Sequence, residues 1–120
     1  MRQRFFFIFS HLWHIMPYGI MCNMVKATLV FRAKKIYPDG SIKEMVLWQL
    51  PDMSPERPHG LKYRLYYSSA DGACLVRYDN ETGKGDHRHL ADYEEPYRFQ
   101  GVEKLVADFQ RDIDLLRRKR

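Results

Sequence analysis

A change in hydrophobic periodicity near Pro96 constrains the fold of this 120-residue chain more than any other feature. After this proline, apolar residues recur at steps of three and four, the spacing that places side chains on one face of an α-helix. The residues in this pattern are Val102, Leu105, Val106, Phe109, Ile113 and Leu116. This pattern predicts one C-terminal amphipathic helix. Glu103 near its start and the basic run 117–120 at its end oppose the charges of the helix dipole, which supports these boundaries.

Upstream of this helix, apolar and polar residues alternate in short runs separated by turn residues, which indicates antiparallel strands. The predicted strands cover Lys26–Lys34, Ser41–Leu50, Leu61–Tyr67 and Cys74–Tyr78. The segment His87–Tyr93 is compatible with a short fifth strand or with irregular structure. We therefore predict an α+β fold, an antiparallel β-meander of four to five strands with the C-terminal helix packed on one face.

Turn residues separate the predicted strands. Tyr37–Gly40 and Ala70–Gly72 carry hairpin signals, whereas the proline-rich segment Asp52–His59 predicts a longer loop. On the second strand, Met45 and Leu47 make one face apolar in addition to the face that carries Val46 and Trp48. We expect the helix or a partner protein to cover this additional apolar face.

Length and composition fit one ordered domain, which we assign to residues 24–120. The formal charge of +5 and the pI of about 9.3 favour an acidic partner such as nucleic acid. Cys22 and Cys74 lack the spacing of a disulfide framework or a thiolate zinc site, so a reducing cytoplasm is the expected location.

The N-terminal run of phenylalanines resembles a signal peptide only superficially. His11 and His14 interrupt its apolar core, no small-residue cleavage site follows, and Pro17 lies inside the window that a membrane span needs. We expect no membrane insertion, and we predict that residues 1–23 form a poorly ordered extension. Met24 is then a candidate for the natural first residue.

Residues of the types found in binding and catalytic sites are most concentrated between Tyr78 and His89. Two glycines in this segment permit positive φ and so bring backbone N–H groups close to an anion. The segment also holds basic side chains and histidines, which titrate near neutral pH. We therefore expect it to bind a phosphate-bearing ligand.

The run RYDNETGKGDHRH at residues 77–89, with residues 59–65 before it and 97–99 after it, resembles the TumE family. The likeness extends over about residues 24–116. It implies a cytoplasmic toxin of bacteria or archaea, the toxin half of a type II toxin-antitoxin pair. It also implies a cognate antitoxin, which in this family usually carries a helix-turn-helix DNA-binding domain. An antitoxin is one partner that the apolar face around Met45 could bind.

Taken together with the resemblance, the residue types are compatible with an action on RNA or on translation. Metal-independent cleavage of RNA needs a base, an acid and cations that stabilise the phosphorane. The candidate catalytic residues are Lys84, Asp86, His87, Arg88 and His89. The candidate substrate-binding residues are Arg64, Arg77, Tyr78, Asp79, Asn80, Gly83 and Gly85. If residues 87–89 are extended, the two histidines share one face, and Arg88 points the other way with Asp86.

Several alternatives stay open at this stage. Asp79 and Asn80 could simply fix the turn, with the histidines at strand ends. The same basic loop could instead serve a non-catalytic inhibitor that binds nucleic acid or protein and is neutralised by its antitoxin. Strand tyrosines such as Tyr63 and Tyr78 suit either a core or an RNA-stacking platform, and the basic run 117–120 suits a solvated helix end or an RNA contact.

A metal site is the least favoured reading of the motif. His87 and His89 could chelate a metal with Asp86, but a catalytic zinc site needs three protein ligands, and we interpret His59 as a turn residue. We therefore expect no metal and no cofactor. The sequence is compatible with a homo-oligomer as well as with a monomer.

Overall fold

The computed structural model describes residues 27–81 and 83–119. The predicted extension at residues 1–23, the candidate start at Met24 and the predicted beginning of the first strand at Lys26 lie outside the described residues. No helix in the described part of the chain is long and apolar enough to cross a membrane.

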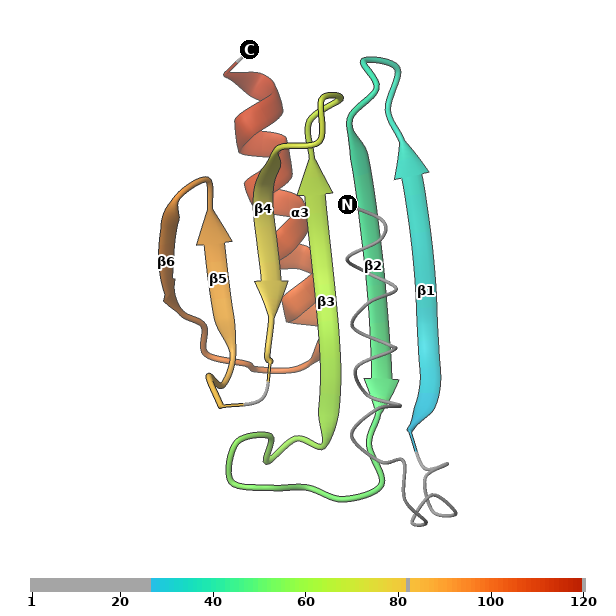
Figure 1. Cartoon of the computed structure of the whole chain (residues 1–120), viewed down its shortest axis with the longest axis vertical. Coiled ribbons are helices and arrows are strands. Elements are labelled where there is room, and N and C mark those ends of the chain that lie inside the picture. The colour runs from blue at the N-terminus through green and yellow to red at the C-terminus, as the bar shows by residue number, and fades with distance from the viewer. Residues whose placement is uncertain (1–26, 82, 120) are drawn as a thin grey trace.

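The described chain forms a six-stranded antiparallel sheet followed by one helix (Figure 1). The elements are β1 Thr28–Ile36, β2 Ile42–Gln49, β3 Leu61–Ser68, β4 Cys74–Asp79, β5 His87–Leu90, β6 Tyr93–Pro96 and α3 Val102–Arg118. The strands lie side by side in the order in which they occur in the sequence. The predicted α+β meander with a C-terminal helix is therefore confirmed.

The predicted number of four to five strands is wrong, because the segment after the loop forms a complete hairpin. Leu90 of β5 pairs with Tyr93 of β6, so only two residues connect these strands. The first of them, Ala91, takes a positive φ of 58°, which is uncommon for a residue other than Gly, Asn or Asp. Because the positive φ falls on an alanine, the turn lacks the glycine or asparagine typical of a two-residue hairpin, and β6 could not be separated from a loop.

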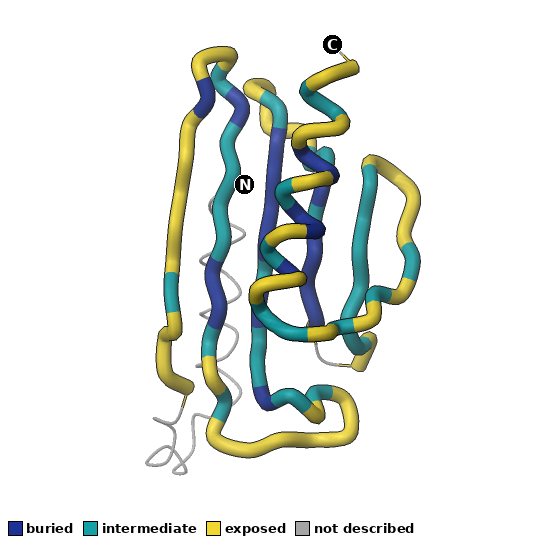
Figure 2. The backbone as a smooth tube through the Cα atoms, turned by 180° about the vertical axis from the view of Figure 1, so that it is seen from behind, coloured by how far each residue is buried: buried dark blue, intermediate teal, exposed yellow. Residues whose placement is uncertain are grey.

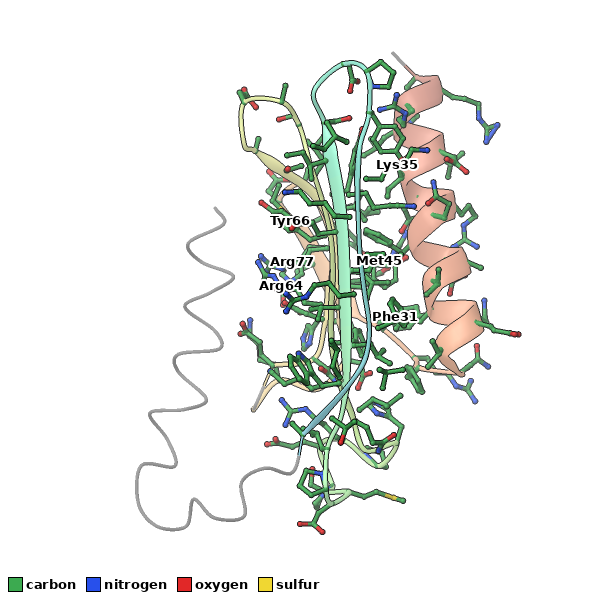
Figure 3. The ribbon with its side chains drawn as sticks, turned by 90° about the vertical axis from the view of Figure 1, so that its right-hand side faces the viewer. Phe31, Lys35, Met45, Arg64, Tyr66 and Arg77 are labelled. Carbon is green, nitrogen blue, oxygen red and sulfur yellow. The ribbon has the colours of Figure 1, made fainter. Side chains whose placement is uncertain are left out.

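Helix α3 covers one face of the sheet and lies over β3 and β4 (Figure 2). The buried core contains Tyr37, Leu47, Tyr63, Leu65, Tyr67, Val76, Tyr78, Leu105, Phe109 and Ile113. Leu47 is 1% exposed and Met45 packs against this core, so the apolar second face of β2 is turned toward the helix. Figure 3 shows Phe31 and Met45 on the helix side and Arg64 and Arg77 on the opposite side.

The end of α3 is attached to the first hairpin through Arg117. Its guanidinium lies 4.0 Å from the ring centroid of Tyr37 and donates hydrogen bonds to Ser41 Oγ and Tyr67 Oη. This part of the basic C-terminal run is therefore a structural contact, and neither predicted role of the run applies to Arg117.

Candidate functional site

The register of the sheet builds the candidate site. One cross-strand row joins Arg64, Asp79 and His87 on β3, β4 and β5. The neighbouring row joins Arg77, His89 and Glu94 on β4, β5 and β6. Because directly paired residues of antiparallel strands point to the same face, both rows lie on one side of the sheet. That side is opposite α3, as the positions of Arg64 and Arg77 in Figure 3 show.

Side chains on these two rows and in the preceding loop form a group that we call the basic cluster. Its members are Arg64, Arg77, Asp79, Lys84, His87, His89 and Glu94. The centre of the cluster is the Glu94 carboxylate, whose Oε2 lies 3.6 Å from Lys84 Nζ, from His87 Nε2 and from His89 Nε2. Three cationic or titratable groups therefore face one carboxylate.

The imidazole of His87 is oriented by a backbone carbonyl. Its Nδ1 lies 3.1 Å from the carbonyl oxygen of Gly85, which can only accept a hydrogen bond. Nδ1 therefore carries a proton, and in the neutral ring Nε2 holds the lone pair. This atom faces Glu94.

His89 is held in a different way, by an arginine. Arg77 Nη2 lies 2.9 Å from His89 Nε2, and a guanidinium only donates hydrogen bonds, so this nitrogen accepts. Burial and the charge of Arg77 lower the pKa of His89 below its usual range. His89 is therefore neutral at pH 7, the state in which an imidazole takes up a proton.

The buried carboxylate of Asp79 contacts both arginines of the cluster, Arg64 and Arg77. Its Oδ2 lies 3.2 Å from Arg77 Nε and 3.8 Å from Arg64 Nη1, and its side chain is 9% exposed. The 3.2 Å contact is not aligned as a hydrogen bond, because within the described residues Arg77 Nε has no hydrogen-bond partner. Burial raises the pKa of the Asp79 carboxyl, although both arginines oppose this effect. Asp79 therefore holds Arg77 in position, and its buried carboxylate is poorly accessible to a ligand.

The two other predicted catalytic residues of the motif lie on the helix side. Asp86 accepts a hydrogen bond of 2.6 Å from Tyr63 Oη and lies 3.1 Å from His59 Nε2. The backbone N–H of Leu61 donates to His59 Nδ1, so the proton of the neutral ring is on Nε2 and points at Asp86. Both nitrogens of His59 are therefore engaged, and Asp86 ties the loop to β3.

Arg88 is part of a second structural network on the helix side. Its Nε and Nη2 reach the two oxygens of Asp112 on α3, at 2.9 and 3.2 Å, and its Nη1 contacts Glu95. Tyr78, predicted to bind substrate, is fully buried and donates a hydrogen bond of 2.5 Å to Asp112. The structure thus separates Arg88 and Tyr78 from the histidines by the thickness of the sheet.

The loop between β4 and β5 is held to β3 at its beginning and is exposed to solvent around Lys84. Asn80 is buried, accepts a hydrogen bond from the backbone of Tyr63 and donates one to the carbonyl of Leu61, so it holds the loop to β3. Gly83 and Gly85 take φ values of 86° and 76°, as expected from their place in the sequence. These conformations leave Lys84, 53% exposed, at the rim of the basic cluster.

Sequence reasoning missed Glu94, the residue at the centre of the cluster. It lies in the Tyr-Glu-Glu-Pro segment of β6, where two adjacent acids point to opposite faces: Glu94 toward His89 and Glu95 toward Arg88. Once β6 is recognised as a strand, period-two alternation separates the two acids. The sequence therefore contains the information that places Glu94, but it can be used only after β6 has been identified as a strand.

The cluster holds three cationic side chains, Arg64, Arg77 and Lys84, and two carboxylates, Asp79 and Glu94. Within residues 27–81 and 83–119, no group of three or more His, Cys, Asp or Glu side chains is arranged to hold a metal ion. Arg77 already donates to the Nε2 of His89, and Lys84 lies beside Glu94. These fixed positive charges oppose a divalent cation and favour a phosphate.

Comparisons with known proteins agree with the motif. The family described as Toxin TumE matches residues 22–117, which is most of the chain. No curated protein and no solved structure matches significantly.

Proposed function

The chain belongs to the TumE toxin family, and we propose that it acts on RNA as a metal-independent endoribonuclease through the basic cluster. The observation that carries this proposal is the convergence of two imidazoles and a lysine on one half-exposed carboxylate, beside two arginines. Imidazole pairs supply acid–base catalysis, and the cations suit the negative charge of a phosphodiester.

In the proposed reaction, the 2′-oxygen of a ribose attacks the adjacent phosphorus and the bond from phosphorus to the 5′-oxygen breaks. His89, which is neutral because its pKa is lowered, accepts the proton of the 2′-hydroxyl once the phosphate has drawn Arg77 away. His87, in its doubly protonated form, donates the proton on Nε2 to the leaving 5′-oxygen and keeps the one on Nδ1 that faces the carbonyl of Gly85. The products are a 2′,3′-cyclic phosphate and a 5′-hydroxyl, so atoms and protons balance.

The remaining cations of the cluster stabilise the phosphorane. Arg77 and Arg64 approach from the buried side and are held by Asp79, whereas Lys84 approaches from the exposed loop. A toxin of this kind acts where RNA and ribosomes are found, in the cytoplasm. We propose that its antitoxin partner, which the family implies, carries a helix-turn-helix domain.

A test compares the purified chain with two variants on total RNA, with and without a chelator. We expect cleavage that is insensitive to the chelator and leaves cyclic phosphate ends. The rate should fall by about 100-fold or more in His87→Ala and less in Lys84→Ala. Lys104→Ala is the matched control, because Lys104 is half exposed on α3 and contacts Asp108 away from the cluster. Cleavage that disappears with the chelator contradicts the proposal.

A second candidate is a non-catalytic inhibitor that binds its target through the same cluster. The contact between Arg77 and His89 favours it, because this hydrogen bond occupies the lone pair that a general base needs. Growth arrest in a host separates the two candidates. A His87→Ala variant that remains fully toxic excludes catalysis by His87 and supports the inhibitor, whereas a folded variant that has lost both toxicity and RNA cleavage supports the ribonuclease.

A further inference from the structure

Among the residues that the structure describes, the carboxylate at the centre of the basic cluster makes three long contacts and no close one. Each of the distances from Glu94 Oε2 to Lys84 Nζ, His87 Nε2 and His89 Nε2 is 3.6 Å, longer than a good charge-assisted hydrogen bond of about 2.8 Å. The three nitrogens come from the loop and from β5, and the carboxylate comes from β6. These contacts are too long for a specific ion pair, and one carboxylate oxygen is shared among the three nitrogens.

The contact between Glu94 and Lys84 is also weak because both side chains are accessible to water. The side chain of Glu94 is 38% exposed and that of Lys84 is 53% exposed. Ion pairs with this exposure contribute little to stability. An incoming anion can therefore displace the carboxylate at little cost.

Glu95, the next residue on β6, shows the contrast. It points to the helix side, contacts Arg88 and is part of the network that includes the buried Asp112. Among the described strands, β6 pairs with β5 alone, so Glu94 lies at an edge of the sheet. Its position allows the side chain to swing away from the cluster without breaking a buried contact.

From these observations we propose that Glu94 occupies the position of the RNA phosphate and that the substrate phosphodiester displaces it to bind between Lys84, His87 and His89. This inference rests on the proposed function, since it assigns the phosphate subsite of the same cluster. Glu94 then acts as an internal competitor that weakens the binding of anions. Its removal should tighten binding.

The experiment titrates inorganic phosphate into the full chain and follows the imidazole proton resonances of His87 and His89 by NMR. We expect Glu94→Gln to bind phosphate about fivefold more tightly than the wild type, because the variant removes the competing charge. Glu103→Gln is the control: it removes one exposed carboxylate at the start of α3, so it makes the same change in net charge. Circular dichroism confirms that both variants are folded.

The outcomes separate the inference from the proposed function. Equal phosphate affinity in Glu94→Gln and Glu103→Gln overturns the inference. So does a large loss of RNA cleavage in Glu94→Gln with unchanged phosphate affinity, because Glu94 is then a general base and the ribonuclease proposal stands. Tighter phosphate binding without any RNA cleavage, by wild type or variant, supports the phosphate subsite and rejects the ribonuclease.

Discussion

The two faces of β4 and β5 carry the same kinds of charged side chain in opposite arrangements. On the helix side, Arg88 meets the two oxygens of Asp112, whose side chain is 4% exposed, and Tyr78 completes the contact. On the other side, Arg77 contacts His89, and a half-exposed Glu94 is shared among several nitrogens. We call the helix side closed, because its carboxylate is buried and directly hydrogen-bonded, and the other side open, because the carboxylate of Glu94 is exposed.

The difference shows that residue type does not reveal the role of a charged group in this motif. On the helix side, Arg88 has the hydrogen-bonded carboxylates of Asp112 and Glu95, which is the condition under which a buried charge is tolerated. On the opposite side, three cations and two imidazoles face the carboxylates of Asp79 and Glu94. Of the two faces of β4 and β5, this is the one on which cations and imidazoles outnumber the carboxylates, so positive charge is left for an anion.

The largest effect is expected from breaking the closed side. Arg88→Ala leaves Asp112 buried without its cation, which should lower the free energy of unfolding by about 3 kcal/mol. Arg77→Ala is the matched variant on the open side; it should cost less than half as much, because Arg64 remains 3.8 Å from Asp79, and should abolish toxicity. Urea unfolding of both variants measures this. Equal destabilisation by the two variants would remove the distinction between the faces.

A smaller effect is expected for Tyr78→Phe. The substitution removes the hydroxyl that donates to Asp112 and keeps the buried ring, so we expect a loss of about 1–2 kcal/mol in stability. RNA cleavage per folded molecule should stay at the wild-type rate. A large drop in that rate, with the fold intact, would return Tyr78 to the functional site.

The pH dependence of stability sharpens the comparison further. Because the pKa of His89 is lowered by burial and by Arg77, the folded state binds fewer protons than the unfolded state at pH values below about 6.5. The stability contribution of a neutral His89 is therefore complete above about pH 6.5 and is lost as the pH falls through the folded pKa. Urea midpoints at pH 7.5 and 5.5 should differ less in His89→Gln than in the wild type. An identical pH dependence in the two proteins argues against a buried, neutral His89.

The smallest effect on stability is expected for Lys84→Ala. This side chain is 53% exposed and its contact with Glu94 is long, so the free energy of unfolding should change by less than about 0.5 kcal/mol. The affinity for a short, non-cleavable RNA should nevertheless fall several-fold and lose part of its salt dependence. Lys104→Ala should leave that affinity unchanged, and a similar loss in both variants would mean that the binding is non-specific.

Much of the fold could be predicted because the relevant signals are local. The helix from Val102 follows from a repeat of apolar residues, and the placement of His87 and His89 on one face, away from Arg88, follows from strand alternation. The sixth strand could not be predicted, because the turn before it depends on the positive φ of Ala91. Glu94 was missed for the same reason, since its face is defined only within that strand.

The sequence by itself therefore determined the α+β class, the order of the elements and the alternation inside the motif, because each depends on the period of side chains along one segment. The tertiary structure alone decided which face of β5 became the closed one. Arg88 pairs with Asp112, 24 residues away on α3, and Asp86 accepts a hydrogen bond from Tyr63 on β3. The two histidines instead contact Glu94 on the opposite face. Such pairings depend on the sheet register and on the face that the helix covers, and no local pattern encodes either of these.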